Sequence, residues 1–254
     1  MIRTSLLGLA VTLGMLSLPV LAQGQNSAQT TILQSLKAAN PNVEYGQPRV
    51  SPITGVYSVQ VKGGPVLYVA ADGKHMIVGD VMTIGANGFA RYEDPQLIED
   101  RKKAIASINV KDTIAFKPKG ETKKVVYVFT DVDCGYCRKL HSQMNEYVED
   151  GQKFKGYNDL GIEVRYLAYP RAGVGSASAQ KLISAWCADN PQDALTKLKN
   201  NQAVENKTCE NPVAAQFGLG GQLGVSGTPS IFTLDGQVLP GYVPPADLAQ
   251  TLGL

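Results

Sequence analysis

Hydrophobic and polar positions divide the chain into segments of different period. Between residues 27 and 39, apolar residues recur at helical spacing, and Asn40-Pro41 ends the pattern. From residue 56 to residue 84 the pattern is that of strands, with Asp72-Gly73 as a strong hairpin signal. The expected strands are residues 56–61, 66–69 and 75–78. We therefore expect a small sheet with one helix.

A second helix follows this sheet. Asp94 is a favourable N-cap residue, Pro95 suits the first helical position, and apolar residues then recur on one face until about Asn109. We interpret this segment as a linker helix between two domains. The sequence does not identify what its apolar face contacts, so a surface helix of one continuous domain is the alternative.

Strands and helices alternate in the rest of the chain. Residues 125–129 form a continuous apolar run, typical of a central strand covered on both faces, and the segment from Cys134 to about Glu149 predicts a helix. Further strands are expected at residues 162–168, 230–234 and 237–239, and further helices at residues 177–188, 194–199, 213–223 and from residue 246. This order predicts an α/β layer fold.

The first residues have the pattern of a secretory signal peptide. Arg3 precedes an apolar run from Leu6 to Leu18, and Val20-Leu21-Ala22 offers small or tolerated residues for cleavage. The run is short for a membrane span, so we expect residues 1–22 to be removed and the mature chain to be exported. An N-terminal membrane anchor is the alternative.

The charge balance narrows the choice of partners. The chain has 24 Lys and Arg residues against 22 Asp and Glu residues, a formal net charge of +2. Such a balance gives no reason to expect nucleic acid or an acidic membrane surface as a partner.

The four cysteines fall into two unlike pairs. Cys134 and Cys137 are two residues apart, whereas Cys187 and Cys209 enclose residues 188–208. A bridge across the long loop would stabilise the fold by about 3 kcal/mol, but the tight pair closes almost no loop. The asymmetry indicates one structural bridge and one working pair.

The motif Cys134-Gly135-Tyr136-Cys137 lies where a buried strand gives way to a helix. Unpaired backbone N–H groups and the helix macrodipole favour a thiolate there, and Cys134, at the helix start, gains most. A c-type haem site would need histidine in place of Arg138. A zinc site with His141 as third ligand lacks a second close pair of ligands. We therefore expect dithiol chemistry with no metal and no cofactor.

Thr228-Pro229 precedes an expected strand and is a candidate cis peptide. This signal is weak alone but informative beside a Cys-x-x-Cys motif. Together with that motif, several segments resemble the DsbC/DsbG family of bacterial periplasmic thiol:disulfide isomerases. They are residues 66–68, 72–75, 129–131, 139–141, 164–168, 186–187, 222–229 and 238–242. The resemblance covers essentially the whole mature chain.

The resemblance implies a fold and a domain organisation. A small cystatin-like dimerisation domain is expected at residues 23–90, a linker helix at residues 91–112, and a thioredoxin-like catalytic domain with a helical insertion at residues 113–254. The resemblance implies that Cys134 is the nucleophile and Cys137 the resolving thiol. It further implies substrate contacts by Gly135, Tyr136, Thr228 and a cis Pro229, and a structural bridge between Cys187 and Cys209.

The implied function is isomerisation and reduction of incorrect disulfides in misfolded periplasmic proteins. A V-shaped homodimer, kept reduced by the inner-membrane thiol reductase DsbD, would carry it out. The alternatives are a DsbG-like sulfenic-acid reductase and a chaperone-type module that binds unfolded chains. Gly135 favours the isomerase, since the DsbG type usually has proline after the first cysteine.

Arg138 departs from the histidine expected in this family. Its permanent charge, one turn after Cys134, predicts a more oxidising pair; a solvated arginine without such an effect is the alternative. We expect Asp131 and Asp133 to be ordinary capping residues rather than proton carriers, and His75 to lie on the surface.

Overall fold

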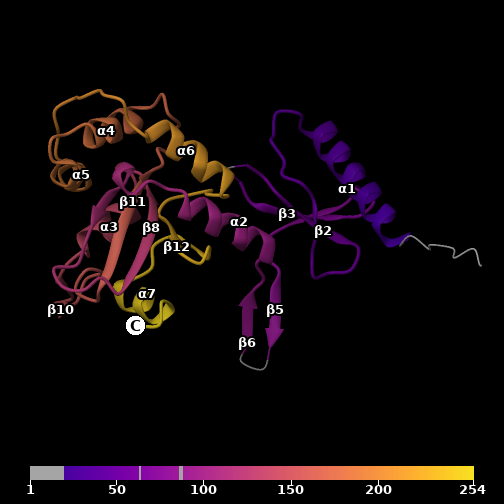
Figure 1. The fold of residues 1–254 in the computed structure, drawn as a ribbon, viewed down its shortest axis with the longest axis horizontal. Helices are drawn as coiled ribbons and strands as arrows, with labels where there is room; N and C mark the ends of the chain where they lie inside the picture. Colours follow the sequence, from indigo (N-terminus) through magenta and orange to yellow (C-terminus); the bar gives the residue numbers. More distant parts are fainter. Residues whose placement is uncertain (1–19, 63, 86–87) are drawn as a thin grey trace, which may run out of the picture.

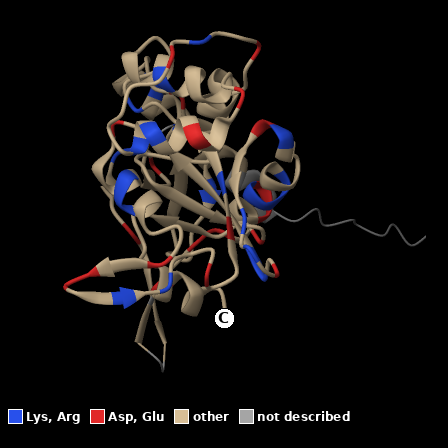
Figure 2. Cartoon of the chain, turned by 90° about the vertical axis from the view of Figure 1, so that its left-hand side faces the viewer, with Lys and Arg blue, Asp and Glu red and all other residues tan. Residues whose placement is uncertain are grey.

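The computed structural model describes residues 20–62, 64–85 and 88–254, which form two lobes joined by a helix (Figure 1). Residues 1–19 of the expected signal peptide lie outside the described residues. The first helix, α1 (Val20–Ala39), ends at the predicted residue but begins earlier than predicted. Basic and acidic positions are interspersed in the view of Figure 2, which faces the C-terminal lobe.

The N-terminal lobe is an antiparallel sheet covered by α1. Its strands, in sheet order, are β1 (Arg49–Val50), β2 (Val56–Gln60), β3 (Val66–Ala70) and β4 (Met76–Val78). Ile32 of α1 is fully buried in one cluster with Val59 and Val69. The three predicted strands and their hairpin are confirmed. Gly73 turns that hairpin with φ +69°, and a Cβ there would lie 2.6 Å from Ser35 Oγ of α1.

A second hairpin follows the small sheet. It consists of β5 (Met82–Gly85) and β6 (Gly88–Arg91), which pair with each other and extend away from the lobes (Figure 1). The sequence did not predict it as a separate unit.

The joining helix, α2 (Pro95–Ala106), begins as predicted. The Asp94 side chain accepts a hydrogen bond from the backbone N–H of Gln96. Ile105 is 1 % exposed and packs with Tyr127 and Phe129 of the C-terminal lobe. The apolar face of the linker helix is thus buried against the C-terminal lobe, a contact that the sequence left open.

The C-terminal lobe contains a five-stranded sheet of order β13–β12–β8–β11–β7. A short 3-10 helix, η1 (Val110–Asp112), leads into it. The strands are β7 (Ile114–Phe116), β8 (Lys124–Thr130), β11 (Ile162–Ala168), β12 (Ser230–Thr233) and β13 (Val238–Pro240). β8 pairs parallel with β11 and antiparallel with β12, so the predicted central strand is confirmed. The sequence missed β7.

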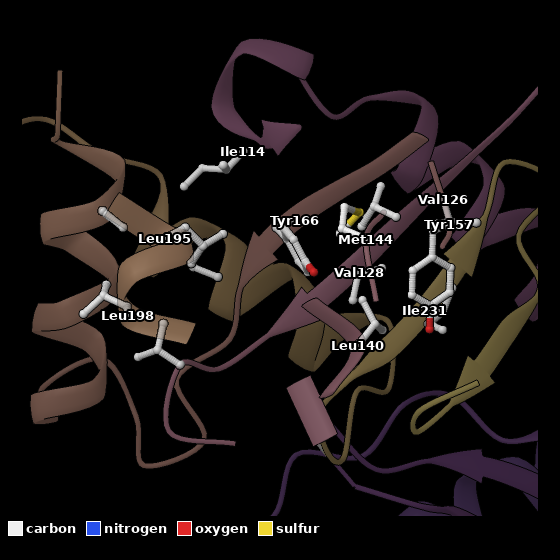
Figure 3. Close-up of a cluster of buried hydrophobic side chains, with 14 of the residues drawn as sticks. Ile114, Val126, Val128, Leu140, Met144, Tyr157, Tyr166, Leu195, Leu198 and Ile231 are labelled. Carbon is white, nitrogen blue, oxygen red and sulfur yellow. The ribbon is translucent and has the colours of Figure 1, made fainter. Parts of the chain in front are cut away.

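Both faces of this sheet are buried, which explains the continuous apolar run in β8. Val126 and Val128 lie in one core together with Leu140, Leu182 and side chains from other elements (Figure 3). The intervening residues of β8 point to the opposite face, where α2 and α6 pack. Because both faces of β8 are covered, the side chains that point to either face are apolar.

A helical insertion separates β11 from β12. It comprises α4 (Ala177–Trp186), α5 (Pro191–Lys199) and α6 (Val213–Gln222), and α7 (Pro245–Thr251) ends the fold. The existence of these helices was predicted correctly, with ends shifted by a few residues.

The prediction of a helix from Cys134 to about Glu149 is wrong beyond Ser142. Helix α3 spans Gly135–Ser142, and a hairpin of β9 (Tyr147–Glu149) and β10 (Gln152–Phe154) follows. Asp150 and Gly151 turn this hairpin with φ values of 51° and 76°. This Asp-Gly pair was a readable turn signal that outweighed the helical pattern.

Candidate active site

The helix α3 starts at Cys134, directly after the loop that follows β8. Cys134 is the N-cap residue of α3, and its Sγ accepts a hydrogen bond from the backbone N–H of Cys137 at 3.3 Å. A sulfur therefore takes the position that an Asp or Ser side chain usually occupies. Negative charge is favoured at that end of a helix, so the local fold already supports a thiolate.

The two cysteines of the motif are free thiols in different surroundings. Cys137 is fully buried and Cys134 is 3 % exposed, whereas Tyr136 between them is 66 % exposed. Cys134 Sγ lies 3.2 Å from the carbonyl oxygen of Thr228, and the Thr228–Pro229 bond is cis. The fold thus brings together residues that are 94 positions apart in the chain.

The pKa values of the two thiols shift in opposite directions. A hydrogen bond with the Cys137 side chain is the largest cause that lowers the pKa of Cys134, to about 5, against the effect of burial. The charge of Arg171 lowers it further. Burial is the main cause that raises the pKa of Cys137, and the bond with Cys134 adds to it. At neutral pH the negative charge therefore lies on Cys134 and the proton on Cys137.

Asp131 is the centre of a buried polar network, and the expectation of an ordinary capping residue is wrong for it. It is 2 % exposed, and its carboxylate accepts hydrogen bonds from Ser178, from the Asp133 backbone and from Arg171. Burial acts to raise the pKa of Asp131, but these hydrogen bonds outweigh it and hold the pKa below its usual value. Asp133 instead forms a half-exposed ion pair with Lys181 at 2.7 Å.

Arg171 is a site residue that the sequence analysis missed. It follows β11 just as Asp131 follows β8, and these two strands are parallel. The carboxyl ends of parallel neighbours lie at the same edge of a sheet, so this pairing was a readable signal. The ion pair fixes a positive charge next to the thiolate of Cys134.

An aromatic surface lies beside the thiols. The ring of Tyr136 stacks on that of Tyr242 with a centroid distance of 6.3 Å, and the ammonium of Lys139 lies 5.1 Å from the centre of the Tyr242 ring. Gly135 is exposed, Pro229 is buried, and Thr228 is partly exposed. The hydroxyl of Thr228 has no hydrogen-bond partner among the described residues.

Arg138 and His141 lie further along α3. Arg138 is partly buried, and its guanidinium donates a hydrogen bond to the carbonyl oxygen of Val132 at 3.1 Å. His141 lies between the hydroxyls of Tyr166 and Thr196, and burial lowers its pKa to about 3. A neutral, hydrogen-bonded imidazole of this kind packs the helix against the core. His75, in the N-terminal lobe, is exposed as expected.

The second pair of cysteines forms a disulfide. Cys187, at the end of α4, is joined to Cys209, in the loop before α6, with a Cα–Cα distance of 5.7 Å. The bond ties two parts of the helical insertion together.

Two further findings concern the described residues as a whole. Within residues 20–62, 64–85 and 88–254, no group of three or more His, Cys, Asp or Glu side chains is arranged to hold a metal ion. None of the helices in the same ranges has the length and hydropathy that crossing a membrane requires.

A free dithiol at the start of a helix, after the central strand of this sheet and opposite a cis-proline loop, defines a thioredoxin-like thiol:disulfide oxidoreductase. The thioredoxin-like domain family matches residues 111–254, and the disulfide bond isomerase protein N-terminal domain family matches residues 21–88.

Known proteins narrow this class further. The chain is 37 % identical to the thiol:disulfide interchange protein DsbC of Dickeya dadantii, over 80 % of this chain and 78 % of that protein. It is 38 % identical to DsbC of Salmonella typhimurium over 85 % and 84 %, and 34 % identical to DsbC of Haemophilus influenzae over 91 % of both. The chain belongs to the DsbC family of thiol:disulfide interchange proteins. It is an enzyme, a protein disulfide isomerase, with the predicted fold class.

Proposed function

We propose that Cys134 is the nucleophile and Cys137 the resolving thiol of a disulfide isomerase that acts on misfolded periplasmic proteins. The observation that carries this assignment is the opposite shift of the two thiol pKa values, with the low value on the residue that caps α3. Only the thiolate attacks a disulfide, so Cys134 reacts first.

The first step forms a mixed disulfide. Cys134 Sγ⁻ attacks one sulfur of the substrate disulfide, a Cys134–substrate bond forms, and the other substrate sulfur leaves as a thiolate. If that thiolate attacks a different substrate sulfur and a further exchange releases Cys134, the protein has isomerised its substrate without net oxidation. If Cys137 attacks Cys134 instead, the substrate leaves with two thiols and the enzyme holds a Cys134–Cys137 disulfide.

Gly135, Tyr136, Thr228 and Pro229 form the surface that meets the substrate. The exposed ring of Tyr136, stacked on Tyr242, supports this role because unfolded chains present apolar side chains. The unpartnered Thr228 hydroxyl and the carbonyl oxygen beside Cys134 are available to the backbone of a bound peptide.

The protein works as a homodimer joined through its N-terminal lobes. Support comes from β4, an edge strand whose three residues Met76, Ile77 and Val78 are all exposed and apolar. An unpaired apolar edge of this kind is a site for pairing with another chain. Sedimentation of Ile77→Lys should give a monomer where the unaltered protein gives a dimer. Val148→Lys, at an exposed position of the C-terminal lobe, is the control and should leave the dimer intact.

The reductive exit leaves the enzyme oxidised, so a dithiol donor must restore it. In the periplasm this donor is the inner-membrane thiol reductase DsbD. The pattern of residues 1–22, with its short apolar run, supports export to that compartment.

The deciding experiment is reactivation of a scrambled, fully oxidised multi-disulfide enzyme in a glutathione buffer by the mature protein. Recovery should require Cys134, so Cys134→Ser should lose it, and Cys137→Ser should accumulate mixed disulfides at Cys134. If folded, reduced protein gives no recovery, the alternatives are a sulfenic-acid reductase or a chaperone. Reduction of a sulfenylated cysteine would indicate the former, and full benefit to a client from a variant without both thiols the latter.

A further inference from the structure

Lys199, at the end of α5, is buried under the active site. It is 2 % exposed, and its ammonium donates to Thr130 Oγ1 at 2.5 Å and to the carbonyl oxygen of Asp131 at 2.9 Å. Burying an ammonium group costs much free energy unless it is compensated, and lysines at helix ends are normally solvated. The burial of this one therefore requires a compensating partner.

Its direct polar partners are neutral oxygens. The carboxylate of Asp131 is already bonded to Arg171 and Ser178, while the carbonyl oxygen that Lys199 contacts also accepts the backbone N–H of Cys134 at 3.4 Å. The Asp131 carbonyl oxygen therefore accepts hydrogen bonds from both the Lys199 ammonium and the backbone of Cys134, the residue that carries the thiolate. The negative charges that compensate the ammonium are those of the dithiol and of the Asp131 carboxylate, which is itself paired with Arg171.

Tyr166, His141 and Arg138, which also lie around Lys199, supply no negative charge. The ring of Tyr166 on β11 lies 5.6 Å from the ammonium, and burial keeps its phenol protonated by raising its pKa. On α3, His141 is neutral and Arg138 is positive, and the charge of Arg138 acts to lower the pKa of Lys199.

The charges of Lys199 and Cys137 each act on the pKa of the other group. Burial, the largest cause, lowers the pKa of Lys199 to about 8, and the charges of Cys137, Cys134 and then Asp131 act to raise it. In return, the charge of Lys199 lowers the pKa of Cys137 against the larger effect of burial. Such reciprocity is a requirement of thermodynamic linkage.

We propose that Lys199 is a positioning residue for the resolving step. Its ammonium is fixed by Thr130 and the Asp131 carbonyl, and it stabilises the Cys137 thiolate that attacks Cys134 in the mixed disulfide. This inference rests on the roles proposed for Cys134 and Cys137. It adds that the helical insertion, through α5, sets how readily the enzyme leaves isomerisation for reduction.

The step that Lys199 assists is balanced. Cys137 gives up its thiol proton, its Sγ attacks Cys134 Sγ, and a Cys134–Cys137 bond forms. The bond between Cys134 and the substrate sulfur breaks, and the leaving thiolate takes up a proton. The substrate gains two electrons and the enzyme loses two, and Lys199 acts through its charge without forming or breaking a bond to sulfur.

The first test uses the unaltered protein. The pKa of the Lys199 amine is followed by NMR of the side-chain Cε and Nζ nuclei in the reduced and the oxidised protein. Disulfide formation removes the thiolate, so the pKa should be lower in the oxidised form. An equal pKa in both forms would overturn the proposal without affecting the roles of the cysteines.

The second test measures the rate at which Cys137 releases glutathione from a mixed disulfide on Cys134, as a function of pH. Lys199→Met should slow release about three- to four-fold at pH 7 for each unit by which the Cys137 pKa rises, because a ten-fold smaller thiolate fraction is partly offset by higher nucleophilicity, and should shift the profile to higher pH. The control is Lys197→Met, which removes an exposed lysine of the same helix. Thr130→Val removes one anchoring bond but keeps the charge.

A purely structural role predicts a different result. Thr130→Val and Lys199→Met would then both lower the free energy of unfolding and leave the pH profile of release unchanged, which would overturn the proposal. Failure of Cys137→Ser to accumulate a mixed disulfide would instead refute the roles of the thiols. If Lys199→Met does not fold, the NMR comparison of the two redox forms decides.

Discussion

The sulfur of Cys134 lies 3.2 Å from the carbonyl oxygen of Thr228, and the same sulfur accepts the backbone N–H of Cys137. One contact is local to the helix start and the other spans 94 positions of the chain. The Cys134 sulfur therefore lies between α3 and the loop before β12, so its surroundings depend on the tertiary fold as well as on the motif.

Alkylation of Cys134 should depend little on pH in the neutral range. Because its pKa is lowered to about 5, the thiolate is almost fully formed above pH 7, and the rate should fall to half near pH 5. The measurement is the rate of iodoacetamide labelling of the reduced protein, with Cys134→Ser as the control for slow reaction at Cys137. A rate that rises about ten-fold per unit up to pH 8, as for an unperturbed thiol, would contradict this assignment.

Arg138→His should make the active pair less oxidising. At pH 8 the imidazole is neutral, so a positive charge that favours the thiolate form is lost. The reduction potential, measured in glutathione buffers, should fall by up to about 30 mV, the two-electron equivalent of ~1.4 kcal/mol. An unchanged potential would mean that Arg171, whose charge acts directly on Cys134, supplies the local positive field without help from Arg138.

Asp131→Asn should lower the free energy of unfolding by about 2 kcal/mol, because it removes the charged acceptor of a buried network. Asp133→Asn, in a half-exposed ion pair, is the matched control and should cost less than about 1 kcal/mol. Urea unfolding measures both. Equal effects would show that the burial of Asp131 has no energetic consequence.

The pH dependence of this stabilisation follows from the direction of the pKa shift. The pKa of Asp131 is lower in the folded protein than in the unfolded chain, where it is about 3.9. Its contribution is therefore complete above the unfolded pKa and is lost as the pH falls from there through the folded pKa. The difference in stability between the protein and Asp131→Asn should shrink over that acidic range and stay constant near neutrality.

Local patterns predicted most of the elements. The hairpin at Asp72-Gly73, the cap at Asp94 and the buried strand before Cys134 each depend on residues adjacent in sequence, and each is confirmed. The prediction that continued the helix beyond Ser142 is wrong for a different reason. There a helical pattern was continued across an Asp-Gly turn whose strands are short and exposed.

The site was only partly accessible from the sequence. The motif indicated two thiols, but the burial of Asp131 and Lys199 depends on contacts with residues at least 40 positions away. A lysine in the last turn of a helix looks like an ordinary solvated residue favoured by the macrodipole. Nothing in its neighbours along the chain indicates that α5 packs against the end of β8.

Removing the bridge of the helical insertion should destabilise the fold without removing the chemistry. The double variant Cys187→Ala, Cys209→Ala opens a loop with a sequence separation of 22, which corresponds to about 3 kcal/mol in the chain-entropy description. Urea unfolding gives the stability, and alkylation of Cys134 should keep its pH profile. A loss of under ~1 kcal/mol would mean that the insertion is held by its packing alone.

Two glycines of α6 should respond in opposite ways to alanine. A Cβ on Gly220 would lie 2.6 Å and 2.7 Å from ring atoms of Tyr169 and 3.1 Å from Phe129, whereas a Cβ on Gly218 would meet nothing within 4 Å. Gly218→Ala should stabilise by up to about 1 kcal/mol through helix propensity. Gly220→Ala should lose about 1–3 kcal/mol, because the rings of a packed core must move. Thermal and urea unfolding of the two variants measure the difference, and stabilisation of Gly220→Ala would mean that α6 does not approach the sheet this closely.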